Sequence, residues 1–303
     1  MTSLAISAIL LSTVFHASWN AIAKNETPSL AFFAFAMSAG ALVATPFHIY
    51  FHVDLTHLPA QFWLITCFSG IAQTVYLGAL ARAYSREELS IVYPLVGCLP
   101  VIGIPLLTAF LFRTNALSVG SWIGIGLIML GSIMIPCSSR KRGASLRHLA
   151  HAAINIIPIA LLAAGATMSY TILDQTALGL MKAHGLSVVD ASTNYMFVQA
   201  YSTLVWIIPA VLVTANQRRL IPKIWRMQLA KSSLAGVTML ATYGLILTAV
   251  SMSKELSHVV ALRQLSLPIG FLIGIICFKE SKSWSKFLGM FVILSGLATV
   301  AYQ

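Results

Sequence analysis

Charged residues are scarce in this sequence. Asp, Glu, Lys and Arg together make up 9% of its 303 residues, whereas 58% of the residues are hydrophobic. A soluble domain carries about 25% charged residues, because its core needs a polar coat. Lipid removes that need, and the chain is long enough for about ten membrane spans of roughly 20 residues. The composition therefore excludes an ordinary soluble protein and predicts a polytopic α-helical membrane protein.

The sequence also lacks the common motifs of enzymes and metal sites. It contains no GxxxxGK[ST], HExxH or GxSxG pattern, and Cys67, Cys98, Cys137 and Cys277 form no CxxC pair. Nucleotide motors, zinc sites and serine hydrolases normally carry such patterns. We therefore expect no metal, no cofactor and no enzymatic activity, and any transport would be secondary or facilitated.

Ten apolar segments follow one another along the chain, and almost all of them have spanning length. Polar or charged turns separate them. We expect helices at 3–23, 29–51, 61–84, 89–112, 117–136, 153–174, 192–213, 230–252, 256–277 and 284–302.

The basic residues are distributed unevenly among the connections between these segments. The odd-numbered connections carry 14 Lys and Arg residues, whereas the even-numbered ones carry only Arg113, Lys182 and Lys254. By the positive-inside rule, the odd connections face the cytoplasm and both termini face outward. The net charge of +11 is explained by this bias and by anionic lipid. No basic face is interleaved with stacking aromatics, which excludes nucleic acid as a partner.

The two halves of the chain share short patterns in register. Glu88-Leu89-Ser90 and Glu255-Leu256-Ser257 are 167 residues apart, as are Tyr76 and Tyr243. Glycines seven residues apart occur at Gly124 and Gly131 in the fifth segment, and at Gly289 and Gly296 in the tenth. These matches predict a first repeat at 1–136, a basic connecting loop at 137–152 and a second repeat at 153–303. Because five helices are an odd number, the second repeat would be inverted, which places a binding site near the midplane between the halves.

Arg263 is the sharpest candidate for a functional residue. It lies several residues from either end of the ninth segment, where a charge costs about 2.5–3.5 kcal/mol on insertion scales. We interpret it as a cavity residue that holds an anionic group of a substrate. The alternatives are snorkelling to the interface or a structural ion pair, with Asp174 at the end of the sixth segment, Glu255 or Glu280 as partners.

Further polar and aromatic residues lie inside the apolar segments. His16 and Asn20 share one face of the first helix with Trp19 nearby, and His16 could carry a coupling proton or bond to a neighbouring helix. Tyr76, Tyr93 and Tyr243 each offer an aromatic face and a hydroxyl, or serve packing only.

Proline and glycine shape several of the helices. Pro94, Pro100 and Pro105 predict a bent fourth helix that acts in gating or is simply kinked, and Pro268 frees a backbone carbonyl beside Arg263. Glycines spaced four apart allow close helix packing, within one chain or in a homodimer; they occur at Gly120 and Gly124 and at Gly270 and Gly274.

Two stretches resemble the EamA-type members of the drug/metabolite transporter superfamily. They are FHASWNAIAK at 15–24 and VVALRQLSLPIGFLIGIICFKE at 259–280, the second followed by the Gly289 and Gly296 pattern. The resemblance covers the whole chain, including its duplicated layout.

The resemblance implies ten helices around a central cavity and transport, often export, of amino acids or related small metabolites. It places Trp19, Asn20, Arg263 and Gln264 at motif positions and makes Glu280 the acidic residue that closes the second motif. Arg113 stands where the first half would have its acidic residue, which favours a structural role for Glu280.

We therefore expect a secondary transporter of a bacterial inner membrane, acting as an exporter by alternating access around a midplane cavity. One alternative is an integral-membrane enzyme that acts on lipid-linked substrates, for which His52, Asp54 and His57 form the only close cluster. Another alternative is a membrane scaffold without transport activity, which would not depend on the cavity residues.

Overall fold

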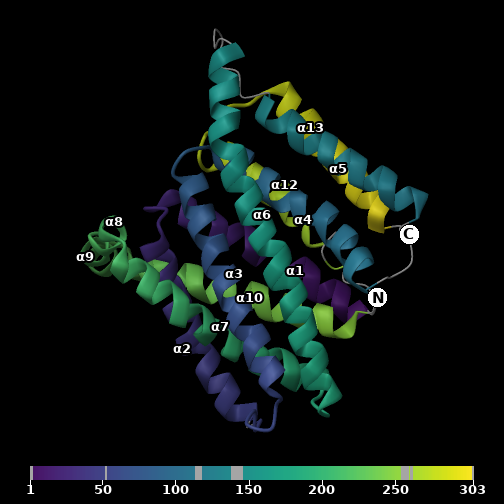
Figure 1. Cartoon of the computed structure of the whole chain (residues 1–303). Helices are drawn as coiled ribbons and strands as arrows, with labels where there is room; N and C mark the ends of the chain where they lie inside the picture. Colours follow the sequence, from purple (N-terminus) through teal and green to yellow (C-terminus); the bar gives the residue numbers. More distant parts are fainter. Residues whose placement is uncertain are drawn as a thin grey trace.

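The computed structural model describes residues 3–51, 53–112, 118–137, 146–253, 259 and 262–301. These residues form helices joined by short connections, and no strand occurs among them (Figure 1). The prediction of an all-α protein is therefore confirmed.

The helices follow the predicted apolar segments closely. In the first half they are α1 (Ser3–Asn25), α2 (Leu30–Phe51), α3 (Ala60–Tyr84), α4 (Leu89–Phe112) and α5 (Val119–Cys137). In the second half they are α6 (Leu146–Ala183), α7 (Val188–Val213), α10 (Leu229–Met252), α12 (Ser266–Ile276) and α13 (Trp284–Ala301). Between α7 and α10 lie two short helices and a π-helical turn: α8 (Ala215–Arg218), α9 (Ile221–Lys223) and η1 (Ile224–Gln228).

Helix α6 is longer than the sequence predicts at both ends. It has 38 residues, so it takes up residues 146–152 of the expected connecting loop and continues nine residues beyond Asp174. The expectation that Asp174 ends the sixth helix is therefore wrong. The helix ends where Gly185 takes a positive φ of 88°. Ser187 then caps α7 by accepting a hydrogen bond from the Asp190 backbone N–H at 3.1 Å.

Six helical stretches of the described chain are long and apolar enough to cross a membrane, as an integral membrane protein requires. They are Ser3–Asn25, Leu30–Phe51, Ala60–Tyr84, Ile156–Ala183, Val188–Val213 and Ala215–Met252. The described parts of the fourth, fifth, ninth and tenth predicted segments form shorter apolar helices, at Leu89–Val101, Val119–Ser132, Ser266–Ile276 and Trp284–Thr299.

The polarity of the molecule is inverted relative to a soluble protein. Leu42, Val205 and Phe291 expose 69%, 65% and 67% of their surface, although they belong to helices. Asp174 and Asn194, by contrast, are buried. Apolar side chains outside and hydrogen-bonded polar groups inside suit a lipid environment.

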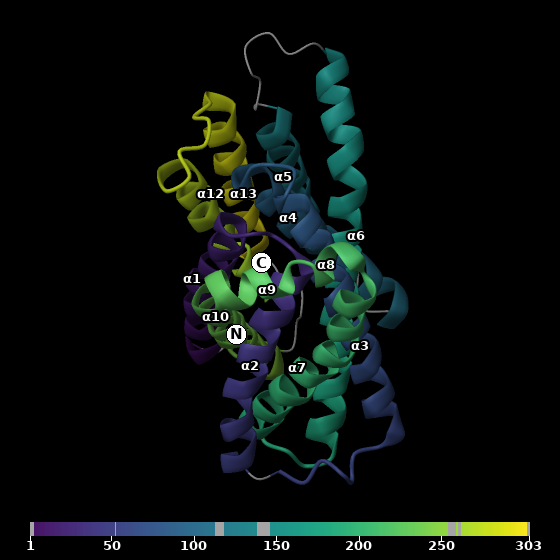
Figure 2. The same cartoon turned by 90° about the vertical axis from the view of Figure 1, so that its left-hand side faces the viewer.

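The main packing contacts connect the first five helices with the later ones. Helix α3 packs on α6 and α7, while α10 packs on α1 and α2. Helix α4 contacts α6 and α12, and α1 also contacts α12. Helix α2 contacts α7, and α5 lies alongside α13 (Figures 1 and 2). The two halves of the chain are thus interleaved, and their interface runs through the middle of the molecule.

Close helix approaches within this interface depend on residues with small side chains. A Cβ atom on Gly131 would overlap the Gly289 carbonyl, and a Cβ atom on Gly296 would overlap the Gly124 carbonyl, so α5 and α13 meet backbone to backbone. A second set of approaches pairs Gly70 on α3 with Ser202 on α7, and Gly236 on α10 with Ala36 on α2.

The odd-numbered connections contact one another at one end of the molecule. The Gln217 side chain accepts a hydrogen bond from the Ala31 backbone N–H at 3.1 Å, and Gln228 donates to the Thr27 hydroxyl at 3.0 Å. The C-terminal ends of α6 and α10, which precede two of the even-numbered connections, also contact each other, because Lys182 donates to the Ser251 carbonyl at 3.1 Å. This grouping is what helices that cross a membrane alternately would produce.

Candidate functional site

Two adjoining cavities lie at the interface between the halves. The space not filled by atoms, which includes open solvent at the cavity mouths, is about 520 Å³ in the first cavity and about 580 Å³ in the second. Both are lined by His16, Tyr76, Thr171 and Arg263, so these four residues form a shared wall. Their side chains come from α1, α3, α6 and the segment just before α12. The cavities thus lie where four parts of the chain converge.

All of the residues predicted to bind substrate line one or both cavities. Asn20, Tyr93 and Gln264 line the first cavity, and Trp19 and Tyr243 line the second. With His16, Tyr76 and Arg263 in the shared wall, the structure brings all eight together.

Arg263 is hydrogen-bonded to the His16 imidazole. The distance from Arg263 Nη2 to His16 Nε2 is 2.9 Å, and the distance from His16 Nδ1 to the Tyr93 hydroxyl is 2.7 Å. A guanidinium can only donate, so Nε2 must accept and the imidazole must be neutral, with its proton on Nδ1. That proton is donated to the Tyr93 oxygen. A second proton on His16 would break the bond to Arg263 and place two cations together, which argues against His16 as a proton carrier.

Asn20 extends this network towards α3. Its side-chain amide donates to the His16 backbone carbonyl at 2.7 Å, and its oxygen accepts a hydrogen bond from the Tyr84 hydroxyl. Asn20 is 1% exposed, so both bonds lie in a dry environment. Asn20 thereby fixes the position of the His16 turn against the end of α3.

The chain is not continuously helical beside Arg263. Residues 262 and 263 are helical, residues 264 and 265 form a turn, and α12 begins at Ser266. The Gln264 carbonyl accepts a hydrogen bond from the Leu267 N–H at 2.8 Å, and Pro268 falls within the first turn of α12, where its missing N–H costs little. The predicted continuous helix at 256–277 is therefore interrupted at the site; residues 254–258, 260 and 261, with Glu255, lie outside the described chain.

Asp174 provides the second charge of the site. It lines the second cavity from α6 and is 4% exposed. Its Oδ1 accepts hydrogen bonds from the Ser69 hydroxyl and, at 2.7 Å, from the Tyr195 hydroxyl. Its Oδ2 accepts one from the Tyr243 hydroxyl at 2.7 Å. Three hydroxyl donors stabilise the ionised carboxylate.

Arg263 and Asp174 do not form an ion pair with each other. Among the described residues, carboxylates within 4.0 Å of a basic group occur only in the pairs His57–Asp54, Lys231–Glu26 and Lys286–Glu88. Two opposite charges thus line the second cavity without neutralising each other through direct contact.

Gln73, Tyr84 and Tyr170 line the cavities but were not among the predicted site residues, and Asp174 was considered only as a possible ion-pair partner of Arg263. A sequence signal existed for part of the group: Ser69, Gln73 and Tyr76 are spaced by four and three residues and therefore share one face of α3. Asp174 was recognised as unusual, but its place at a supposed helix end concealed its burial.

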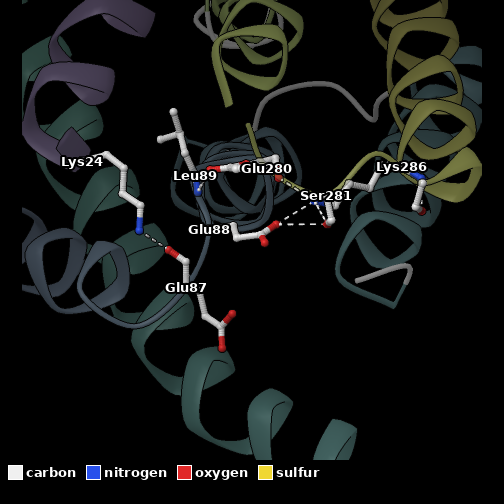
Figure 3. A network of polar contacts seen from close by, with 9 residues as sticks. Lys24, Glu87, Glu88, Leu89, Glu280, Ser281 and Lys286 are labelled. Carbon is white, nitrogen blue, oxygen red and sulfur yellow. Dashed lines mark hydrogen bonds and ion pairs between the residues drawn. The ribbon is translucent and has the colours of Figure 1, made fainter. Parts of the chain in front are cut away.

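Glu280 lies away from the cavities and holds the start of α4 (Figure 3). Its Oε1 accepts a hydrogen bond from the Leu89 N–H at 2.8 Å and its Oε2 accepts one from the Ser90 N–H at 3.0 Å. A carboxylate at a helix N-terminus satisfies free N–H groups and interacts favourably with the helix dipole. This geometry suits the structural role predicted for Glu280, whereas Arg113 lies outside the described chain.

Two lysines reinforce the same end of the molecule (Figure 3). The fully buried Lys286 side chain donates to Glu88 at 2.8 Å and to the hydroxyls of Ser90 and Ser281. Lys24 donates to the Glu87 backbone carbonyl at 2.6 Å. Burial raises the pKa of the Glu87 carboxyl, and the negative charge of Glu88 adds to this effect. We call this network of Lys24, Glu88, Glu280 and Lys286 the α4 anchor.

Pro94 and Pro100, which were predicted to act in gating, are buried in a helix that continues through them. Pro94 and Pro100 both lie within α4, and Pro100 also lines the first cavity. The loop cluster considered for an enzyme is different in character: Asp54 and His57 form an exposed pair at 3.2 Å, and His52 lies outside the described chain. No group of three or more potential metal ligands occurs among the described residues.

Comparisons with known proteins establish the fold alone. No protein-family model matches the sequence, and no curated protein matches it. Twenty chains of solved structures match it. One of them, titled only as the crystal structure of a protein, aligns with 99% of this chain and 96% of its own, with a TM-score of 0.59 and 16% sequence identity. The helical arrangement thus occurs in an experimentally determined structure over nearly the whole length of both chains.

Proposed function

We propose that this chain is a secondary transporter, acting as an exporter of small polar metabolites that carry an anionic group. The observation that carries the proposal is the position of Arg263. It faces two cavities between the halves of the chain, and its side chain is bonded to the neutral His16 and to the Tyr170 side chain. A cation held by neutral partners in a membrane interior is a natural site for an anionic ligand.

The proposal includes ten spans arranged as two inverted five-helix repeats. The packing supports this arrangement. By order within each half, α1 corresponds to α6, α3 to α10 and α4 to α12. The α3–α6 contact therefore has its counterpart in the α10–α1 contact, and the α4–α6 contact in the α12–α1 contact. The glycine contacts support it at single-residue level. Gly70 corresponds to Gly236, and Ala36 corresponds to Ser202 at the same separation along the chain. The contact between Gly70 and Ser202 thus has its counterpart in the contact between Gly236 and Ala36.

Inverted repeats suggest a transport mechanism. Two similar halves around one site can rock between a form open to one side and a form open to the other, which is alternating access. The α4 anchor ties α4 to the connection before α13 at the end where the odd connections meet, and in this form it would close that end. The charge bias of those connections and the EamA-like motifs support a cytoplasmic location of this end in a bacterial inner membrane.

Transport by the purified protein in liposomes tests the proposal. A panel of small metabolites is loaded with and without an imposed pH gradient, and flux is compared between the wild type, Arg263→Ala and Arg82→Ala. Arg82 is exposed at the end of α3 and lines neither cavity, so its replacement controls for the loss of an arginine.

We expect saturable flux in the wild type and in Arg82→Ala, and its loss in a folded Arg263→Ala protein. Equal flux in Arg263→Ala and the wild type would refute the site. Absence of flux across the whole panel would refute transport and favour the enzyme or scaffold alternatives.

A further inference from the structure

The connection between α7 and α10 concentrates positive charge that no acidic residue nearby in the sequence offsets. Residues 191–254 contain no Asp or Glu. The basic residues of the connection and of the first turn of α10 are Arg218, Arg219, Lys223, Arg226 and Lys231. Lys231 is paired with Glu26, whereas none of the other four forms an ion pair within the part of the chain that the structure describes. We call residues 214–228, which carry these four exposed cations, the basic connection.

The basic connection also exposes large apolar side chains. Trp225 and Met227 expose 60% and 74% of their surface, and Val213, which precedes the connection, exposes 83%. Helix α7 before it and α10 after it belong to stretches that are long and apolar enough to cross a membrane. The connection therefore lies at the boundary of the apolar layer, where tryptophan is enriched and long basic side chains reach the phosphate groups.

The inner side of the basic connection is fixed to the rest of the molecule. Ile224 is fully buried, while Gln217 is bonded to the Ala31 N–H and Gln228 to the Thr27 hydroxyl. Helices α8 and α9 lie at the edge of the molecule in Figure 1 and face the viewer in Figure 2. The cations are thus presented on a surface that is already formed, and a ligand that binds there does not have to order the backbone first.

We propose that the basic connection binds the headgroups of anionic phospholipids. Three of its four cations are arginines, and a guanidinium can hold a phosphate through two parallel N–H···O bonds. The exposed Trp225 and Met227 side chains would contact the lipid below its headgroup. An acidic protein segment would match the charge but would leave these apolar side chains without a use. The proposal needs only a membrane around the chain and does not depend on transport.

Native mass spectrometry of the purified protein in detergent tests the surface. The protein is mixed with equal amounts of phosphatidylglycerol and phosphatidylcholine with identical acyl chains, and the retained molecules of each lipid are counted. One variant carries glutamine at all four cations of the basic connection. The control variant carries glutamine at four exposed cations from other odd-numbered connections and an adjoining helix end, and so loses the same charge. These are Arg82, Arg86, Lys279 and Lys282.

We expect the wild type and the control variant to retain phosphatidylglycerol about tenfold or more over phosphatidylcholine, because each basic residue near an anionic lipid contributes about a factor of five. The variant of the basic connection should retain the two lipids equally. Its side chains are exposed, so the variant should still fold. An undiminished preference in this variant would overturn the proposal, as would an equal loss of preference in the control variant.

Tryptophan fluorescence locates the bound lipid. The emission that is lost in Trp225→Phe belongs to Trp225, which lies among the cations. Phosphatidylglycerol with brominated acyl chains should quench this emission more strongly than brominated phosphatidylcholine in the wild type, and to the same extent in the variant of the basic connection. Equal quenching by the two lipids in the wild type would contradict the proposed location.

Competition distinguishes a lipid from other anionic partners. Inorganic phosphate at the concentration of the lipid should not displace phosphatidylglycerol, because it has no apolar part to contact Trp225 and Met227. Displacement by phosphate would indicate a site for free phosphate instead. Capture of a soluble polyglutamate peptide, together with equal retention of the two lipids, would assign the surface to an acidic protein and reject the lipid.

Discussion

At the scale of single residues, the site is organised around two charges that the fold holds in different ways. Arg263 is bonded to the neutral imidazole of His16 and to the Tyr170 side chain. Asp174 is held by hydroxyls from three helices, α3, α7 and α10. The carboxylate therefore connects four helices through hydrogen bonds, and its partners contribute to the stability of the fold as well as to the charge of the cavity.

Tyr195 separates these two contributions, because it bonds to Asp174 but lines neither cavity. Tyr195→Phe removes one donor to a buried carboxylate. We expect the free energy of unfolding to fall by about 1–2 kcal/mol, measured by denaturation in mixed micelles. Tyr50→Phe is the control, since Tyr50 is 83% exposed. If both variants are equally stable, the Tyr195 bond does not support the fold.

The identity of the cavity residues could largely be predicted from sequence. A polar residue in an apolar run must find a partner or a cavity, and His16, Asn20 and Arg263, which were singled out on this ground, all line a cavity in the structure. The partners of these residues could not be predicted, because they come from positions distant in the chain. Tyr93 and His16 are 77 residues apart, and only the fold brings their side chains within hydrogen-bond distance.

At the scale of helices, α5 and α13 meet through glycines on both sides. Gly131 and Gly289 each place a bare backbone against the carbonyl of the other. A methyl group at either position has no room unless the two helices move apart.

Substitution of Gly131 tests this contact. We expect Gly131→Ala to lower the free energy of unfolding by about 1–3 kcal/mol through overpacking. Gly126 lies on the same helix, and a Cβ atom there meets nothing within 4 Å. Gly126→Ala should therefore be neutral or stabilise the helix by up to about 1 kcal/mol. Equal stability of the two variants would show that α5 and α13 do not need the glycine contact.

Helix positions followed from hydropathy, whereas interruptions and extensions did not. Apolar runs of about 20 residues located α1 to α5 within a few residues. The turn at residues 264 and 265 lies inside an apolar run, where composition gives no signal for it. Helix α6 continues past Asp174 to Ala183. A carboxylate interrupts an apolar run and therefore suggests a helix end, but Asp174 is bonded to hydroxyl groups of three other helices inside the fold.

At the scale of the whole molecule, the grouping of the helix ends is the feature that bears on the proposed topology. The first connection is bonded to the segment between α7 and α10, and the C-terminal ends of α6 and α10 are bonded to each other. Ten crossings with both termini on one side would produce this arrangement.

Labelling of single cysteines in intact cells tests the topology, in a background without the four native cysteines. A membrane-impermeant maleimide should label His57→Cys and His184→Cys directly, and Ser85→Cys and Arg218→Cys only after permeabilisation; all four positions are exposed. Members of one set that behave oppositely would contradict the count of ten. A complete reversal would keep the count and invert the orientation.

Helix α6 has a length that no membrane span requires. Its 38 residues extend about 57 Å, against a hydrocarbon thickness of about 30 Å, so even a strongly tilted α6 leaves the bilayer. Figure 1 shows its first turns standing beyond the other helices. The same helix carries Asp174 in the cavity wall, with Pro158 between that residue and the outer end. Helix α6 therefore connects the wall of the second cavity with a region outside the hydrocarbon layer through one continuous run of backbone hydrogen bonds that is interrupted only where the proline lacks its N–H.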